Sequence, residues 1–380
     1  PFMNGMKDWF LLDPDMTFLN HGSFGACSKP VFENYQEWQR ILENQPVQFM
    51  TDHVYSALND SRIALCDFVG CDEDELIFFP NSTTAVTNVL YNLDLKSGDE
   101  VLMSNHEYGA LVRGWKEWGK KTGVNIIQQE ISTPVMTEEK FIEEFWKGLT
   151  PKTKVIFLSH ITSATALIFP IEKIVNMARE KGILTIIDGA HAPAHIPLNI
   201  HELGCDFYTG ACHKWLCGPK GSSFLFVKKE HQDWIKPLVV SWGSDGDDPT
   251  PSTFLQDFQW QGTRDMSAFL TMPTAIDFYK KEIRPYQAAC QKIIQYAYSE
   301  LQSTLNSLPI SPGGSWLGQM VAHPLPSQKN PDLKEKLWKD HQIEIPIFEW
   351  NNQHYIRISI QVYNSKNDVD LLMSALRSML

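Results

Sequence analysis

The chain has 380 residues, of which 43% are hydrophobic and 21% charged, as in ordinary folded proteins. This length suffices for two domains, each with its own core. The formal net charge of -12 argues against nucleic acid or an anionic membrane as a partner, because both would repel the chain. Apolar runs are short and interrupted, so we expect neither a membrane span nor a signal peptide.

Seven cysteines are present, and none is arranged as a Cys-x-x-Cys pair. Neither a disulfide framework nor a zinc site is therefore indicated. Reduced thiols in a cytoplasmic protein are the expected state.

The first half of the chain alternates short β-rich runs with helical stretches. Residues 1–20 are expected to form an arm, and alternation then extends from about Val31 to Val227. The predicted strands are Leu76–Phe79, Val101–Ser104, Asn125–Gln128, Val155–Ser159, Leu184–Ile187 and Ser223–Val227. The predicted helices between them are Ser82–Leu93, Gly109–Lys121, Glu138–Lys147 and Ile171–Lys181. This order predicts βαβ units and a parallel sheet, hence an α/β fold.

The second half has a different texture. The acidic, proline-rich segment Asp245–Pro251 is predicted to be a loop or boundary. A long helical stretch is expected over Met266–Leu305, followed by proline- and glycine-containing loops. The strand-like Tyr355–Gln361 and a helix over Asp368–Leu380 would complete a smaller α+β unit.

Ligands of open α/β sheets bind beyond the carboxyl ends of the strands, so the segments that follow strands are the candidates for chemistry. Hydroxyl side chains follow the strand that ends at Phe79, where Ser82, Thr83 and Thr84 begin a helix. Such hydroxyls and free N–H groups can cradle a phosphate. Ordinary helix capping explains them equally well when they are taken alone.

Asp188 ends an apolar strand, where a carboxylate is costly unless it meets a cation. A protonated pyridine nitrogen is one such cation, and a structural turn cap is the alternative. Lys214 follows His213 among small and aromatic residues, a setting that lowers an amine pKa. His106 and Tyr108 follow another strand and could stack on a flat heteroaromatic ring.

Together these segments resemble the class V aminotransferase family of pyridoxal-5′-phosphate (PLP) enzymes of fold type I. Within that family the chain is most similar to the isopenicillin N epimerase-like group, which includes ergothioneine-pathway C–S lyases. The resemblance spans Phe18 to Tyr363 and is strongest at Leu19–Gly25, Asp188–His191, His213–Leu216 and Gln261–Arg264. It implies an arm (1–20) packed with the small domain, a large PLP-binding domain (21–260) with a mainly parallel sheet, and a small α+β domain (261–380).

The resemblance also implies roles for individual residues. Lys214 would bind PLP covalently and shuttle the α-proton, while Asp188 would pair with the pyridine nitrogen. His191 would approach the ring hydroxyl. His106 matches the stacking position, and Tyr108 is a candidate for stacking or acid–base work.

The phosphate, the phenolic oxygen and the substrate would be held by further residues. Phosphate binding is implied for Ser82, Thr83, Thr84, His213 and, from a neighbouring subunit, Thr263. Thr162 would bond the phenolic oxygen, Arg357 would grip the substrate α-carboxylate, and Asn20 would lie at the substrate mouth. A homodimer with shared active sites follows.

Two departures from the family pattern bear on the activity. Ala211 stands where many relatives carry a polar residue, which removes one possible phosphate contact. The stretch Leu305–Pro326 holds no cysteine, so sulfur transfer through a mobile cysteine, as in cysteine desulfurases, is not expected.

The reaction type stays open at this point. An epimerase or racemase acting on an amino acid or an amino-acid-containing small molecule ranks first by resemblance. A C–S β-lyase similar to hercynylcysteine sulfoxide lyase ranks second, an aminotransferase third, and a non-catalytic PLP-fold regulator or scaffold is the alternative of another class. A dehydrogenase, a P-loop enzyme and a serine hydrolase are disfavoured because their glycine-rich signatures are missing or misspaced. No metal site is expected, since Pro193 breaks the helical spacing of His191 and His195.

Overall fold

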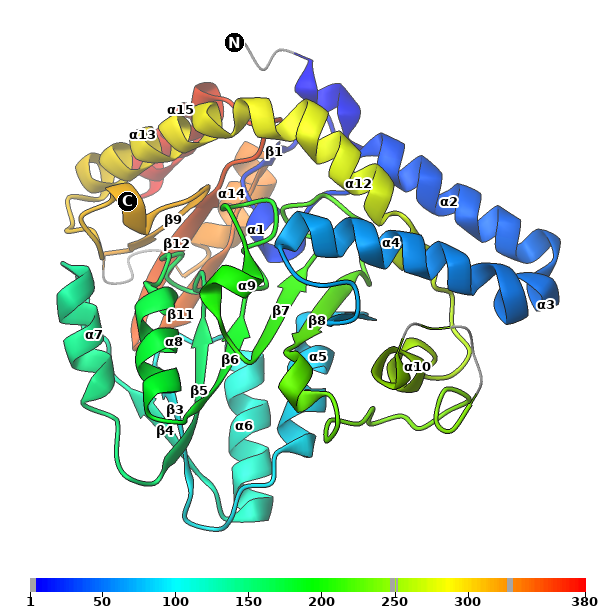
Figure 1. Cartoon of the computed structure of the whole chain (residues 1–380). Coiled ribbons are helices and arrows are strands. Elements are labelled where there is room, and N and C mark those ends of the chain that lie inside the picture. Colours follow the sequence, from blue (N-terminus) through cyan, green and yellow to red (C-terminus); the bar gives the residue numbers. More distant parts are fainter. Residues whose placement is uncertain (1–4, 247–249, 251, 327–330) are drawn as a thin grey trace.

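The computed structural model describes residues 5–246, 250, 252–326 and 331–380 (Figure 1). Part of the predicted boundary Asp245–Pro251, at 247–249 and 251, lies outside the described residues. A membrane-crossing helix would need a longer apolar stretch than any helix of the described residues has.

A seven-stranded sheet forms the centre of the molecule. Its strands in spatial order are β2 (Leu76–Phe79), β8 (Ser223–Val227), β7 (Phe207–Ala211), β6 (Leu184–Asp188), β5 (Thr153–Ser159), β3 (Glu100–Ser104) and β4 (Asn125–Gln129). The pairs between β7, β6, β5, β3 and β4 are parallel, and β8 runs antiparallel to both of its neighbours. The expected α/β fold with a mainly parallel sheet is confirmed.

Helices cover the sheet on both faces. They are α5 (Ser82–Asn92), α6 (Gly109–Thr122), α7 (Glu138–Trp146), α8 (Ile171–Glu180) and α9 (Ile200–Leu203) (Figure 1). Strand β5 shows why: Ile156 and Leu158 join one core cluster with residues of α8, whereas Val155 and Phe157 join another with residues of α5 and α6. A strand buried on both faces reads as a continuous apolar run, which is how β5 appears in the sequence.

A second layer holds a three-stranded antiparallel sheet, β11 (Ile347–Trp350), β12 (Gln353–Ser359) and β9 (Met320–Pro324). Its helices are α13 (Gln287–Leu305), α14 (Leu333–His341) and α15 (Lys366–Met379). From the N-terminal segment, β1 (Thr17–Phe18) pairs in parallel with β10 (Ile343–Glu344). The start of the chain thus lies against its last third.

Further helices precede and follow the central sheet. Those near the N-terminus are α1 (His21–Phe24), α2 (Lys29–Asn44), α3 (Pro46–Gln48) and α4 (Val54–Val69). Those after the sheet are α10 (Thr253–Gln259), α11 (Ser267–Leu270) and α12 (Met272–Phe278). Short 3₁₀ and π turns occur at Met6–Trp9, Phe49–His53, Lys229–His231, Tyr279–Ile283, Arg284–Tyr286 and Gly314–Trp316.

One expectation about the elements was wrong, and one strand was not predicted. The stretch Met266–Leu305 is not one helix but α11, α12 and α13 with irregular turns between them. Pro285 lies in the last of these turns, where its missing N–H prevents a regular helix from continuing. Strand β7 lies within a segment that the sequence analysis treated only as the carrier of Lys214.

Candidate active site

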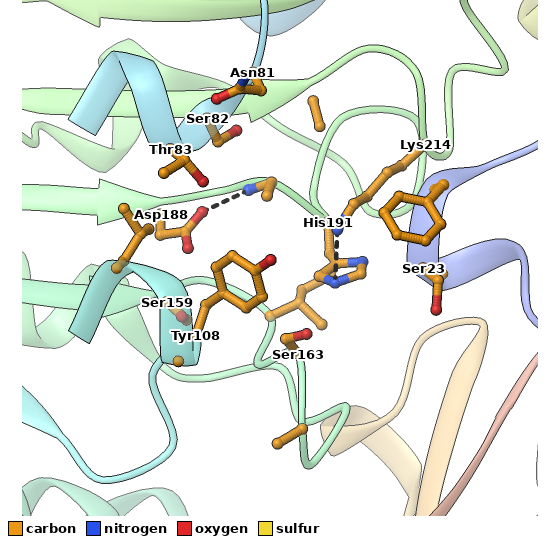
Figure 2. Close-up of a pocket in the computed structure, with 18 of the residues that line it drawn as sticks. Ser23, Asn81, Ser82, Thr83, Tyr108, Ser159, Ser163, Asp188, His191 and Lys214 are labelled. Atoms are coloured by element: carbon orange, nitrogen blue, oxygen red, sulfur yellow. Dashed lines mark hydrogen bonds between the residues drawn. The ribbon is translucent and has the colours of Figure 1, made fainter. Parts of the chain in front are cut away.

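A cavity of about 690 Å³ opens at the carboxyl ends of β3, β5 and β6 (Figure 2). The start of α5, the β7–β8 connection, α1 and strands β11 and β12 also contribute to its wall. The polar and charged residues of its lining include Ser23, Ser82, Thr83, Glu107, Tyr108, Ser159, Ser163, Asp188, His191, His213, Lys214 and Arg357.

Lys214 lies in the β7–β8 connection and its side chain points into the cavity (Figure 2). Burial and the nearby Arg357 lower the pKa of its amine from 10.5 to about 8, while Asp188 acts in the opposite direction. Its Nζ lies 3.3 Å from His191 Nε2. Because Trp215 Nε1 donates to His191 Nδ1 over 3.2 Å, the proton of the neutral imidazole belongs on Nε2. Lys214 then accepts it as a neutral amine, which is the nucleophilic form.

The backbone of Lys214 is fixed by the N-terminal glycine-containing motif. His21 Nε2 donates to the Lys214 carbonyl oxygen over 2.8 Å. Gly25 has a φ of +71°, and a Cβ at this position would lie only 2.0 Å from the His213 carbonyl oxygen. This close backbone approach requires glycine. Sequence reasoning used this motif for the resemblance but did not foresee that it positions the lysine.

Asp188 ends β6 and is buried at the cavity wall. Among the described residues its carboxylate accepts one hydrogen bond, from the Ala190 N–H, at 3.1 Å from Oδ1. Burial raises the pKa of this carboxyl. A buried carboxylate with so few partners is suited to a cationic N–H, and the pyridine nitrogen of PLP provides one. The residues present therefore fit this cofactor.

The predicted phosphate residues fall into two groups. Ser82 and Thr83 line the cavity at the beginning of α5, whose first N–H groups lack partners within the helix. His213 lines it as well, with Nδ1 held by the Ser222 carbonyl oxygen at 3.1 Å. Thr84 lies outside this wall, because its N–H and hydroxyl both donate to the capping Asn81.

Arg357 brings a buried guanidinium into the cavity from β12. Nη1 donates to the Ser163 carbonyl oxygen over 2.6 Å and Nη2 to Ser23 Oγ over 3.1 Å. Its Nε has no partner, and no carboxylate of the described residues forms a salt bridge with it. Burial lowers its pKa to about 10. A buried cation without an anion suits a substrate carboxylate.

The structure does not place His106, the predicted stacking residue, at the cavity. Its ring is buried outside the cavity wall, with Nδ1 at 2.8 Å from Thr165 Oγ1 and Nε2 at 3.0 Å from the Ile131 carbonyl oxygen. Burial lowers its pKa to about 4, so the ring is neutral. Tyr108, 45% exposed, lies at the cavity instead (Figure 2).

Three other predicted residues also lie outside the wall. Thr162 is buried and bonds to Thr165 Oγ1 at 2.6 Å, and thus stabilises its own loop. Asn20 accepts the Ser23 hydroxyl hydrogen at 2.5 Å, so Ser23 rather than Asn20 faces the cavity. Thr263 lines a separate cavity together with Met50, Trp242 and other residues.

Sequence reasoning missed several polar wall residues, namely Ser23, Glu107, Ser159 and Ser163. Ser159 ends a predicted strand and Glu107 lies three residues after another, so their position near the carboxyl ends of the sheet was the available signal. No comparable local signal distinguished Ser23, which reaches the cavity through a long-range contact with Arg357.

Comparisons with known proteins show the family to which the chain belongs. Residues 28–372 match the family model for class V aminotransferases. The chain is 29% identical to the isopenicillin N epimerase of Amycolatopsis lactamdurans, covering 97% of this chain and 96% of that protein. It is 30% identical to the isopenicillin N epimerase of Streptomyces clavuligerus, covering 98% of each. A probable chloroplastic L-cysteine desulfhydrase of Arabidopsis thaliana is 26% identical, over 97% of this chain and 83% of that protein.

Solved structures show the same fold. A C-DES mutant with glycine covalently linked to its PLP cofactor superposes with a TM-score of 0.84 at 20% identity, covering 98% of this chain and 99% of that one. A cysteine desulfurase from Thermococcus onnurineus NA1 gives 0.81 at 20% identity, covering 98% and 96%. The chain belongs to the class V aminotransferase family and is a PLP-dependent enzyme.

Proposed function

We propose that the chain is an epimerase or racemase that acts at the α-carbon of an amino acid or of a small molecule that contains one. The observation that carries the proposal is the presence of two proton-transferring groups, Lys214 and Tyr108, in one cavity but on different elements (Figure 2). Inversion requires proton removal on one face of the α-carbon and proton delivery on the other. We place the enzyme in the cytoplasm, where its seven free cysteines would stay reduced.

The residues of the cavity have distinct roles in the proposed reaction. Bound PLP supplies an electron sink that makes the α-proton acidic. Arg357 holds the substrate carboxylate, so the α-carbon is fixed relative to the two proton carriers. The Lys214 amine removes or returns a proton on its own face, and the Tyr108 hydroxyl serves the other face. Asp188 would keep the pyridine nitrogen protonated, and Ser82, Thr83 and His213 would hold the phosphate.

A C–S β-lyase is the second candidate. L-Cysteine desulfhydrases and a hercynylcysteine sulfoxide lyase of Schizosaccharomyces pombe are also relatives over most of the chain. A lyase needs a leaving group on the β-carbon and one base, and Lys214 alone meets the second requirement. Transamination, the third candidate, needs proton return to the cofactor carbon instead.

A panel of amino acids incubated with the enzyme in deuterated water distinguishes these reactions. We expect α-deuterium exchange together with inversion in the wild type. Tyr108→Phe should keep exchange but lose inversion, because Lys214 still serves its face. Pyruvate release without inversion would replace the proposal with the lyase, and amine transfer to a keto acid would replace it with the aminotransferase. Exchange and inversion that are unchanged in Tyr108→Phe would remove the two-carrier mechanism.

We also propose that the enzyme is a homodimer with shared sites. Thr263 does not line the cavity that holds Lys214 of its own chain. The cavity that it does line includes Val47 and Trp242, whose side chains are 76% and 81% exposed. Large exposed apolar side chains of this kind are typical of a protein interface. This arrangement supports a model in which Thr263 completes the phosphate site of the partner subunit.

Mixed dimers test the shared site. We expect Lys214→Ala subunits and Thr263→Ala subunits each to be impaired alone. Their mixture would pair an intact Lys214 with an intact Thr263 in one of two sites. Recovered PLP binding and activity are expected. No recovery after mixing that is confirmed by mass would reject the shared-site model.

A further inference from the structure

Glu107 is a buried carboxyl group at the cavity wall to which the proposed mechanism gives no role. Its Oε1 lies 2.7 Å from Ser104 Oγ at the end of β3, and its Oε2 lies 2.5 Å from Ser159 Oγ at the end of β5. Among the described residues, no lysine, arginine or histidine forms a salt bridge with it. A buried carboxylate with hydroxyl partners but no cation is expensive to ionise.

The second acid of this region is Asp188, at the end of the neighbouring strand β6. Ser159 and Asp188 are paired residues of β5 and β6, so the hydroxyl that binds Glu107 stands beside the strand end that carries Asp188. Burial, and to a smaller extent the charge of Asp188, raise the pKa of Glu107 to about 8, although the hydrogen bonds from Ser159 and Ser104 act in the opposite direction. Two neighbouring buried carboxyls resist ionising together, so one keeps its proton.

The contacts of Glu107 provide a position for that proton on Oε2. Ser104 Oγ already accepts the His106 N–H at 3.1 Å, so its own hydroxyl hydrogen is free to be donated to Glu107 Oε1. The 2.5 Å contact between Ser159 Oγ and Glu107 Oε2 is a Ser159 donation when Glu107 is ionised, and it becomes an O–H donated to Ser159 when Glu107 is protonated on Oε2. Ser159 lines the cavity, and its own hydroxyl hydrogen then becomes available there (Figure 2).

We propose that Glu107 is a positioning residue of the cofactor site, which remains a neutral acid so that Asp188 alone carries the negative charge facing the pyridine nitrogen. The neutral acid also orients Ser159 so that its hydroxyl donates into the cavity. This inference rests on the proposed role of Asp188 opposite the ring nitrogen.

Infrared difference spectroscopy of the holoenzyme tests the protonation state directly. The wild type minus Glu107→Gln should contain the carbonyl stretch of a protonated carboxylic acid at neutral pH, and this band should fade as the pH rises through about 8. Glu349→Gln, which removes an exposed acid from the same wall, should leave the band in place. In Asp188→Asn the band should disappear at a lower pH than in the wild type, because the charge that opposes ionisation is gone.

Cofactor affinity tests the positioning role. Glu107→Gln imitates the neutral acid and should keep the PLP Kd within about threefold of the wild type, whereas Glu107→Ala loses both hydrogen bonds and should weaken binding about tenfold or more. No acid band in the wild type, a band unmoved by Asp188→Asn, or a Glu107→Gln variant as weak as Glu107→Ala would each overturn the proposal. Failure of the Asp188 assignment alone would appear instead as normal turnover in Asp188→Asn with the Glu107 band still present.

Discussion

The Asp188→Asn variant distinguishes two roles of Asp188, binding the cationic ring nitrogen of PLP and stabilising a buried turn. In the cofactor-free protein the carboxyl is buried, accepts one N–H and has its pKa raised by desolvation. A carboxyl whose folded-state pKa lies above its unfolded value loses stability as pH rises from the unfolded pKa upward. Asparagine does not titrate. The cofactor-free variant should therefore be as stable as the wild type or more stable, and its advantage should grow as pH rises above the ordinary aspartate pKa.

With PLP bound, Asp188→Asn should be unfavourable instead of neutral or favourable. Removing one partner of a buried ion pair costs about 3–5 kcal/mol. If that loss falls on the protonated ring that stabilises the transition state, turnover drops by on the order of 10²-fold or more, since 1.36 kcal/mol is tenfold in rate. The lysine and the phosphate contacts remain, so the variant should still bind PLP.

Two measurements check this prediction. Chemical unfolding of the cofactor-free wild type and variant over a pH series measures the change in stability. Turnover of the PLP-loaded proteins measures the change in catalysis. A variant that loses stability without cofactor yet turns over at a near-normal rate would refute the reasoning, because Asp188 would then be a structural turn residue.

Three further predictions follow from the site geometry. Arg357→Gln should raise KM for a carboxylate substrate by on the order of 10²-fold while PLP stays bound. Arg357→Lys should recover little of this loss, because an ammonium cannot reproduce the bidentate contact. A KM close to the wild-type value in both variants would contradict the assigned role. The rate at which the cofactor-free protein captures PLP, measured by stopped-flow absorbance, should follow the neutral fraction of Lys214. Because the pKa of this buried amine is about 8, the rate should level off above about pH 8. A rate that kept rising toward pH 10.5, as for an ordinary lysine, would exclude the assignment. Gly25→Ala should impair PLP binding, because its Cβ would collide with the His213 carbonyl oxygen. Gly114→Ala is the control, since nothing lies within 4 Å of a Cβ at that position. Equal cofactor affinity in the two variants would show that the motif does not position Lys214.

Much of the central sheet could be predicted from local sequence. Strands such as β5 are short apolar runs bounded by polar residues, and the helices between them carry an apolar face. Strand β7 was missed because Gly210 interrupts its β-forming pattern and the segment drew attention for its lysine. The break within Met266–Leu305 was missed although Pro285 signals it.

The site was predictable where its residues follow strands, and less so elsewhere. Asp188, His191 and Lys214 come together because strand ends meet at one edge of the sheet. The contacts of Arg357 with Ser163 and Ser23 join distant segments and leave no local pattern. His106 and Tyr108 would face the same side of an extended chain. A turn at these residues buries His106 and leaves Tyr108 at the cavity. The two residue types alone do not predict which of them lies at the cavity.

The central claim is that Lys214 carries the cofactor in this cavity. Borohydride reduction of the loaded protein, followed by peptide mass spectrometry, locates the pyridoxyl group on a single residue. We predict an adduct on Lys214, and none on that peptide in a Lys214→Ala variant that still folds. An adduct on Lys220, whose amine donates to the Gly25 carbonyl oxygen instead, or on any other lysine, would contradict the account.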